Sequence, residues 1–401
     1  MLLFHHYHLN LRRAIHSDFW LFELSIWLHV FARSLIAVFV PIMLLRIGYT
    51  IPNVILFLFL LCLIDFPFNF VAQWLVRTIG ARWVMVCAML ATIGFFLVLY
   101  GLGPNDWNSM LTLATLGALY DAFFWVAHLY LFIGTNKKKD NTAEKTGILY
   151  MVRQLGGVLG PAIGAVILLI AGKDALILVS VVILGFSILP LLKLKADHDK
   201  PKKTTVANFR RYFAHLTEKK NYIASALQSI HAQTEANLWP LFIFATIGTV
   251  ESVAAVPIIV SITAILFSYL AGKLSAREGE KMIVVGSALI AIIWVLRLQT
   301  DSTVFYYVSI FLIGLFSLLV TIPLDSNIFE RAKILDPLSG STYRNATRVL
   351  VNACFYGSLL LIINIFRASF LTATVSVFVL MVVSFIFLRY TTKLNTKQPA
   401  A

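Results

Sequence analysis

The sequence predicts an all-α membrane protein with twelve transmembrane helices arranged as two repeats of six. Three observations predict it: an apolar composition, twelve long apolar runs and a short segment that occurs twice. Apolar residues make up 59% of the chain, and charged residues make up only 13%. A water-soluble chain of this length has too little interior to hide so much apolar surface, so the lipid bilayer is the expected solvent.

The apolar runs are each expected to cross the membrane, which requires about 20 residues in a helix. Only helices and closed barrels satisfy their backbone inside lipid, and these runs are too long for barrel strands. The runs span residues 19–45, 53–76, 83–103, 110–133, 148–171, 175–192, 221–247, 253–272, 282–299, 304–328, 346–366 and 370–389.

The repeated segment follows the second and the eighth run. Its first copy is Ala72–Arg82 and its second copy is Ala271–Lys281, with alanine, leucine and glycine in register. Pro41 and Pro240 keep the same offset. A duplicated helical bundle is therefore expected, an arrangement from which transporters are often built.

A charged segment divides the runs six and six. We expect an N-terminal bundle over residues 1–192, a cytoplasmic linker over 193–220 and a C-terminal bundle over 221–401. A short amphipathic helix on the membrane surface and a solvated tether are both compatible with the linker. The apolar residues that would form the helix face are Phe209, Tyr212, Phe213 and Leu216.

The lysines and arginines predict the orientation. They crowd one set of loops, the linker and the tail, whereas the opposite loops hold only Arg46, Lys173 and Arg367. Positive loops stay in the cytoplasm, so both termini are expected there, with the protein spanning the inner or plasma membrane of the cell. The net charge of +14 lies in short loops rather than on one water-facing surface, which argues against nucleic-acid binding.

Ionisable side chains near the middle of a run are costly in lipid and are functional candidates by default. The candidates for a proton and substrate cavity are Arg33, His29, Asp65, Asp121, Glu235 and His231. Three acids and one arginine leave an acid without a partner, and an unpartnered acid in lipid is easily protonated. Glu235 is the first choice for the proton carrier and Asp121 the second. Alternatively, pairs such as Arg33 with Asp65 or Asp121 only hold the helices in register.

Three further arginines lie inside the runs. Arg297 is expected to extend outward to the membrane surface. Arg153 and Arg348 are expected to extend to the cytoplasmic surface, with a gating role as the alternative.

The twelve runs, the basic central segment and the twin loops resemble the major facilitator superfamily. The family's loop motif is Gly-x-x-x-Asp-Arg-x-Gly-Arg-Arg/Lys. The matching residues here are Gly80, Arg82, Gly272, Arg277, Gly279 and Lys281. Arg77 and Ala276 stand where the family has Asp. The resemblance implies that these loops latch the two halves on the cytoplasmic face. Tight turns and positive anchoring would explain the same residues without a latch.

The fifth run carries a second resemblance. Residues 156–164 are similar to the family's Gly-x-x-x-Gly-Pro-x-x-Gly-Gly segment, which is associated with antiporters. Gly156, Gly160 and Gly164 share one helix face and allow another helix to approach closely. Pro161 lacks a backbone donor and can kink the helix. The resemblance implies export by exchange, and close packing alone is the alternative.

These features together predict a secondary active transporter that moves a small molecule by alternating access, proton-coupled and working as an exporter. The alternative is a facilitator, or a proton symporter that imports a sugar or another polar solute. The sequence has no phosphate-binding motif and no catalytic spacing, so neither ATP as the energy source nor an enzyme is expected. The expected partners are a small-molecule substrate, the bilayer and protons; we expect a monomer with no cofactor and no metal ion.

Overall fold

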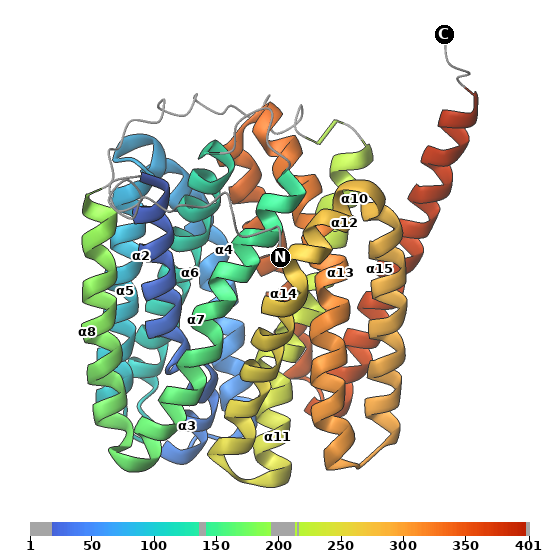
Figure 1. Cartoon of the computed structure of the whole chain (residues 1–401). Coiled ribbons are helices and arrows are strands. Elements are labelled where there is room, and N and C mark those ends of the chain that lie inside the picture. The colour runs from blue at the N-terminus through green and yellow to red at the C-terminus, as the bar shows by residue number, and fades with distance from the viewer. Residues whose placement is uncertain (1–17, 136–141, 194–212, 215, 398–401) are drawn as a thin grey trace, which may run out of the picture.

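The computed structural model describes residues 18–135, 142–193, 213–214 and 216–397. These residues form helices joined by short turns, and no strand occurs among them. The helices pack side by side, with the earlier part of the chain on the left of Figure 1 and the later part on the right. We call residues 18–193 the N-half and residues 216–397 the C-half. The all-helical fold class predicted from the sequence is confirmed.

The helices of the N-half are α2 (Asp18–Ser34), η1 (Ala37–Phe39), α3 (Val40–Ile47), α4 (Ile51–Thr78), α5 (Ala81–Gly101), α6 (Trp107–Thr135), α7 (Thr142–Ile170) and α8 (Gly172–Leu192). Those of the C-half are α10 (Leu216–Gln233), η2 (Thr234–Leu238), α11 (Trp239–Ile247), α12 (Val250–Gln299), α13 (Thr303–Leu335), α14 (Pro337–Leu359) and α15 (Ile365–Lys397).

Each predicted run has a helix, although helices and runs do not match one to one. In the described part of the chain, nine helices are long and apolar enough to cross a membrane. Helix α12 counts once but holds two predicted runs, and it bends at Glu278, whose φ of −135° and ψ of 30° are not helical. The seventh and eleventh runs, α10–α11 and α14, are not among the nine. The arrangement is therefore consistent with twelve membrane crossings.

The first crossing of each half is broken at an equivalent place. Helix α2 ends at Ser34, and Pro41 lies in the first turn of α3. Helix α10 gives way to the π-helical turn η2, and Pro240 lies in the first turn of α11. Proline lacks the backbone N–H that would continue a helix, so the matching prolines break the two crossings alike.

The predicted boundary of the eleventh run was wrong. Residues 346–366 were expected to span, but α14 begins at Pro337 and ends at Leu359. Asp336 caps its start by accepting the N–H of Leu338 at 3.2 Å. This cap and the proline after it favour a helix start ahead of the apolar residues. Leu361 and Ile363, predicted inside the membrane run, are 88% and 103% exposed in the turn that follows.

The two ends of the bundle differ in charge. The turns at Gly80, Glu278 and Asp336 lie at the end where the basic loops gather, uppermost in Figure 1, and we call it the basic end. The turns at Gly48 and Gly248 lie at the opposite end, and both glycines have positive φ. Most of the linker, including Phe209 and Tyr212 of the predicted amphipathic helix, lies outside the described residues.

The outward faces of the helices are apolar. Large exposed side chains occur on α5, α8, α12 and α15, for example Leu97 (57%), Phe186 (59%), Leu266 (62%) and Ile386 (62%). Such a surface on every side is what a lipid solvent requires. The chain is a multi-pass integral membrane protein.

Candidate functional site

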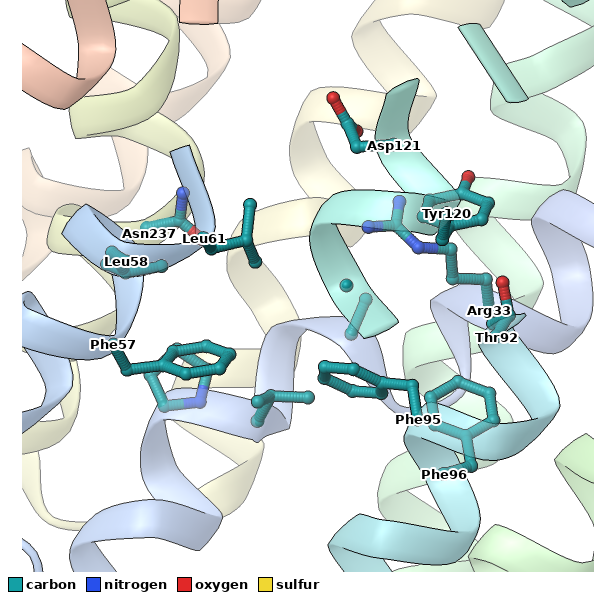
Figure 2. A pocket seen from close by; sticks show the side chains of 14 residues that line it. Arg33, Phe57, Leu58, Leu61, Thr92, Phe95, Phe96, Tyr120, Asp121 and Asn237 are labelled. Atoms are coloured by element: carbon teal, nitrogen blue, oxygen red, sulfur yellow. The ribbon is translucent and has the colours of Figure 1, made fainter. Parts of the chain in front are cut away.

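A cavity of about 110 Å³ lies inside the bundle (Figure 2). Helices of the N-half supply nearly all of its lining, and Asn237 of η2 adds one residue from the C-half. The polar lining residues are Arg33, Thr92, Tyr120, Asp121 and Asn237. The large apolar lining residues are Phe57, Leu58, Leu61, Phe95 and Phe96. The space is thus mainly apolar, with one cation and one acid on its wall.

Arg33 lies in the last turn of α2 and is half-buried. Its guanidinium carbon lies 4.4 Å from the centre of the Tyr120 ring. The two side chains lie next to each other in Figure 2. Among the described residues no carboxylate lies within ion-pair distance of this group. The alternative that Arg33 pairs with Asp65 or Asp121 is therefore not what the structure shows.

Asp65 and Asp121 instead face each other. Asp65 is buried on α4, and its Oδ1 accepts the side-chain amide of Asn69 at 2.9 Å. Asp121 on α6 accepts the indole N–H of Trp125 at 3.0 Å. The two carboxyl groups lie close enough to interact, and Oδ2 of Asp65 has no hydrogen-bond donor. Two ionised carboxylates that lie close together in a buried site repel each other, so this arrangement favours a proton on one of them.

The carboxyl pair, Asp65 and Asp121, is linked to the C-half through Asn69. The Asn69 side-chain oxygen accepts the side-chain amide of Asn345 on α14 at 2.7 Å. A chain of hydrogen bonds therefore runs from the cavity wall to the other half of the molecule.

His29 does not line the cavity. Its ring is buried behind Tyr120, with Nε2 at 3.2 Å from the Tyr120 hydroxyl. It also stacks on Phe124 at a ring distance of 4.5 Å. His29 holds the Tyr120 ring against which Arg33 lies.

The second set of predicted residues forms a separate cluster. Arg297 on α12 donates to both carboxylate oxygens of Glu235, at 2.5 and 3.3 Å, and to Ser309 at 2.7 Å. Its guanidinium carbon also lies 3.6 Å from the centre of the Trp239 ring and 4.7 Å from that of Trp294. We call these five residues the ion-pair cluster.

Two predictions are corrected here. Arg297 does not extend outward, because its residue exposure is 4% and a carboxylate and two indole faces compensate for its burial. Glu235 is therefore not the acid left without a partner. The premise that made it the first choice for the proton carrier does not hold.

His231 is fixed beside this cluster. Its Nδ1 accepts the indole N–H of Trp294 at 2.8 Å, and its Nε2 lies 2.9 Å from the Ser317 hydroxyl. Because Nδ1 accepts a bond, it carries no proton in this arrangement. His231 thus acts as a neutral spacer between α12 and α13.

At the basic end, the first loop copy lies against the C-half. Gln73 donates to the Ser339 hydroxyl at 3.4 Å. Gly80 has a φ of +91°, which suits glycine in a tight turn. Arg77 precedes this turn, and Arg82 bonds the backbone oxygen of Leu192 in its own half at 3.5 Å.

The second copy lies against the N-half. A Cβ on Gly147 of α7 would lie 3.2 Å from Gly272, so the two helix backbones nearly touch. Gly279 packs on Pro323 within its own half. Arg277 and Lys281 lie on the exposed bend, where Lys281 is 3.5 Å from Glu278. The glycines thus make the close contacts and the basic residues lie at the surface.

A buried ion pair beside these loops joins two residues that were not paired from the sequence. Arg344 on α14 holds the Asp325 carboxylate with two bonds of 2.8 and 2.5 Å, and the Tyr150 hydroxyl of the N-half donates to it at 2.5 Å. The predicted eleventh run, 346–366, leaves Arg344 outside the membrane, whereas α14 begins at Pro337 and includes it. Asp325 in the tenth run was the available signal.

Arg153 also differs from expectation. Its guanidinium lies over the Trp125 ring, 4.3 Å from the ring centre, rather than extending to the surface. Trp125 is the donor to Asp121, so Arg153 lies next to the carboxyl pair. One further buried residue, Glu23, was missed, and an acid inside an apolar run was the signal for it.

The glycines of α7 lie against α2. A Cβ on Gly156 would lie 3.0 Å from the backbone of Phe31, and one on Gly164 would lie 2.2 Å from the Leu35 oxygen. A Cβ on Gly160 would clash with Ser34. Pro161 lies inside α7, which continues past it. This contact fixes the end of α2 that carries Arg33.

Comparisons with known proteins agree on the family. The sequence profile described as Major Facilitator Superfamily matches residues 23–334. No curated protein matches the sequence.

Solved structures match over nearly the whole chain at low identity. The transporter FucP in its outward conformation has a TM-score of 0.67 at 14% identity, covering 93% of this chain and 99% of its own. A variant of the E. coli fucose:proton symporter FucP has a TM-score of 0.67 at 12% identity, covering 91% and 97%. The human organic anion transporter MFSD10 has a TM-score of 0.59 at 12% identity, covering 93% and 99%. These structures share the fold, and the profile match covers most of the chain, so this protein belongs to the major facilitator superfamily.

Proposed function

We propose that this protein is a proton-coupled secondary transporter that carries a small solute by alternating access. The observation that supports the proposal is the carboxyl pair, Asp65 and Asp121, beside the cavity. Asp121 lines the cavity and lies close to the buried Asp65, whose Oδ2 has no donor. In our proposal the two carboxyl groups share one proton, because two ionised carboxylates would repel each other. A site that holds one proton next to a solute cavity is what proton coupling needs.

The carboxyl pair also has a route to the other half. Asn69 donates to Asp65 and accepts from Asn345 of the C-half. Loss of the shared proton would place two negative charges side by side, and the repulsion would move the side chains that hold this chain together. In our proposal, proton release therefore weakens the contact between the halves.

Alternating access also requires contacts between the halves that can part. At the basic end these contacts are glycine against glycine at Gly147 and Gly272, and amide to hydroxyl at Gln73 and Ser339. The broken first crossings at Pro41 and Pro240 supply discontinuous helices near the cavity, as in many transporters. We propose that residues 1–192 and 221–401 move as two bundles joined by the linker at 193–220, with both termini in the cytoplasm. We further propose that the protein works as a monomer in the inner or plasma membrane.

The sense of coupling has two candidates. The sequence favoured export by exchange, on the glycine segment of α7, but these glycines are occupied by contact with α2, which explains them without transport direction. Co-transport is the second candidate, since Arg33 and Asp121 line the same cavity and a proton and a solute can occupy it together. In this proposal Glu235 and Arg297 serve as a structural pair.

The test uses purified protein in liposomes that contain a pH-sensitive dye. Carboxylates, amines and sugars are added outside, and solute-induced proton movement is recorded. Wild-type protein should move protons inward with the solute for co-transport, and outward against inward solute for exchange. Asp121→Asn keeps the side-chain size and removes the titration, so proton movement should fall about tenfold, within the range usual for coupling between two ligands.

Asp174→Asn is the matched control, since Asp174 is exposed at the start of α8, at the opposite end of the bundle. It should behave like wild type. Unchanged proton movement in both Asp65→Asn and Asp121→Asn would reject the carboxyl pair as the proton site.

A further inference from the structure

We infer that the solute is a small organic carboxylate with an apolar, preferably aromatic body, and that Arg33 binds its carboxylate. This inference rests on the proposed transport function and names the substrate class for the same cavity.

The bonding of Arg33 differs from that of two buried arginines. Arg297 and Arg344 each hold a carboxylate with two N–H bonds. The guanidinium of Arg33 donates to no side chain in the described parts of the structure, and it lies over the Tyr120 ring. A guanidinium is a planar set of five donors that matches a carboxylate. Arg33 is therefore ready to bind an anion that comes from outside the protein.

The charged groups on the cavity wall favour an anionic solute over a cationic one. Asp121 also lines the cavity, but its carboxyl already accepts the Trp125 indole N–H and, in the proposed function, shares a proton with Asp65. A cationic solute would have to break this arrangement to reach the acid. An anionic solute meets Arg33 without displacing any bond within the protein.

The apolar lining of the cavity favours an apolar solute body. In Figure 2, the rings of Phe57, Phe95 and Phe96 lie below Arg33. The body of a solute whose carboxylate binds Arg33 would lie against these rings. Thr92 already donates within its own helix, to Ala88 at 3.0 Å. A sugar needs many polar partners when it is buried, and this wall offers few of them. A short aromatic or aliphatic body suits it.

Binding of the solute is coupled to binding of the proton. The charged or titratable groups around the carboxyl pair are Arg33 on α2, Cys62 on α4, Tyr120 on α6, Arg153 on α7 and Arg348 on α14. Binding of the shared proton removes one negative charge from the pair and leaves the field of Arg33 less compensated by Asp121. Proton and carboxylate therefore favour each other's binding, and their co-transport at one to one moves no net charge across the membrane.

The test compares three probes with the same ring: benzoate, benzamide and benzylamine. Binding to the purified full chain is measured by calorimetry at mildly acidic and mildly alkaline pH. We expect benzoate to bind best and to bind more tightly at the acidic pH. Arg33→Gln should weaken benzoate binding by about tenfold or more, as expected for loss of a charge-assisted bidentate pair, while Arg33→Lys should restore part of it.

Arg46→Gln is the control, because Arg46 lies at the opposite end of the bundle, against the Phe244 ring. It should bind benzoate like wild type. Each variant is checked for wild-type melting temperature and elution volume, and Arg33→Lys with a wild-type fold keeps the test valid if Arg33→Gln unfolds. Tighter binding of benzylamine than of benzoate, or benzoate binding that is unaffected by both Arg33 variants, would overturn the inference.

Its failure can be told apart from failure of the proposed function. If benzoate does not bind but sugars or amines move protons in liposomes, the substrate class is wrong and proton-coupled transport stands. If benzoate binds through Arg33 but no solute moves protons, the binding site stands and the proton coupling is wrong.

Discussion

The two groups of charged residues inside this bundle look alike in sequence and differ in structure. Each half has a charged residue on its first crossing, just before an equivalent proline: Arg33 before Pro41, and Glu235 before Pro240. In the C-half the acid pairs with an arginine that also contacts two indoles and a hydroxyl, and every member of the ion-pair cluster lies within that half. In the N-half the cation and the acids remain apart, and Asn69 links the carboxyl pair to the C-half.

The difference separates a structural role from a functional one. A charge whose partners are all in its own half holds that half together, and it does not need to change during transport. A charge whose bonding is incomplete, or depends on a proton, changes its surroundings when a ligand arrives. We therefore propose that Glu235 serves stability and that Arg33, Asp65 and Asp121 serve transport.

The largest expected effect comes from breaking the ion-pair cluster. Glu235→Gln leaves Arg297 buried without a counter-charge and should lower the free energy of unfolding by about 3 kcal/mol. Replacing both residues by leucine removes the uncompensated charge and should recover most of this loss. Unfolding in detergent, followed by tryptophan fluorescence during titration with SDS, measures both. A single variant as stable as wild type would mean that the cluster is not a structural pair.

A smaller effect tests the contact of α7 with α2, the helix that carries Arg33. In Gly164→Ala the added Cβ would meet the Leu35 oxygen at 2.2 Å, so α2 must move away from α7. We expect a loss of about 2 kcal/mol, as for overpacking elsewhere, together with weaker binding at Arg33. Gly185→Ala is the matched control, since a Cβ there has no neighbour within 4 Å. Equal stability of the two variants in the same SDS titration would contradict the close contact.

The smallest effect tests the bond between the halves. A double-mutant cycle on Asn69→Ala and Asn345→Ala should give a coupling energy of about 1 kcal/mol, typical of one hydrogen bond. The cycle on Ser229→Ala and Asn352→Ala is the control, since this 2.8 Å bond lies within the C-half. Only the first cycle should also change solute-induced proton movement in liposomes. Proton movement that changes equally in both cycles would mean that the link across the halves has no special role.

The sequence alone predicted the fold and most of the candidate site residues, but it did not predict which residues pair with each other. Hydropathy located the runs because lipid imposes a length on each helix. Pairing depends on helix rotation, which periodicity does not give, so Arg297 was expected to extend to the membrane surface although it pairs with Glu235. The start of α14 was missed because its first turns are polar, and Arg344 was therefore not placed inside the protein.

The π-helical turn from Thr234 to Leu238 has a consequence for the whole seventh crossing. A π-turn holds one residue more than an α-turn, and one residue corresponds to about 100° of helix rotation. The extra residue therefore rotates the part of the crossing that follows it about the helix axis. His231 lies before the turn and bonds to Trp294 of the C-half, whereas Asn237 lies at the end of the turn and lines the cavity of the N-half. Deleting a single residue from this turn would restore an ordinary helix and rotate α11 as a unit, so that one crossing could no longer serve both halves.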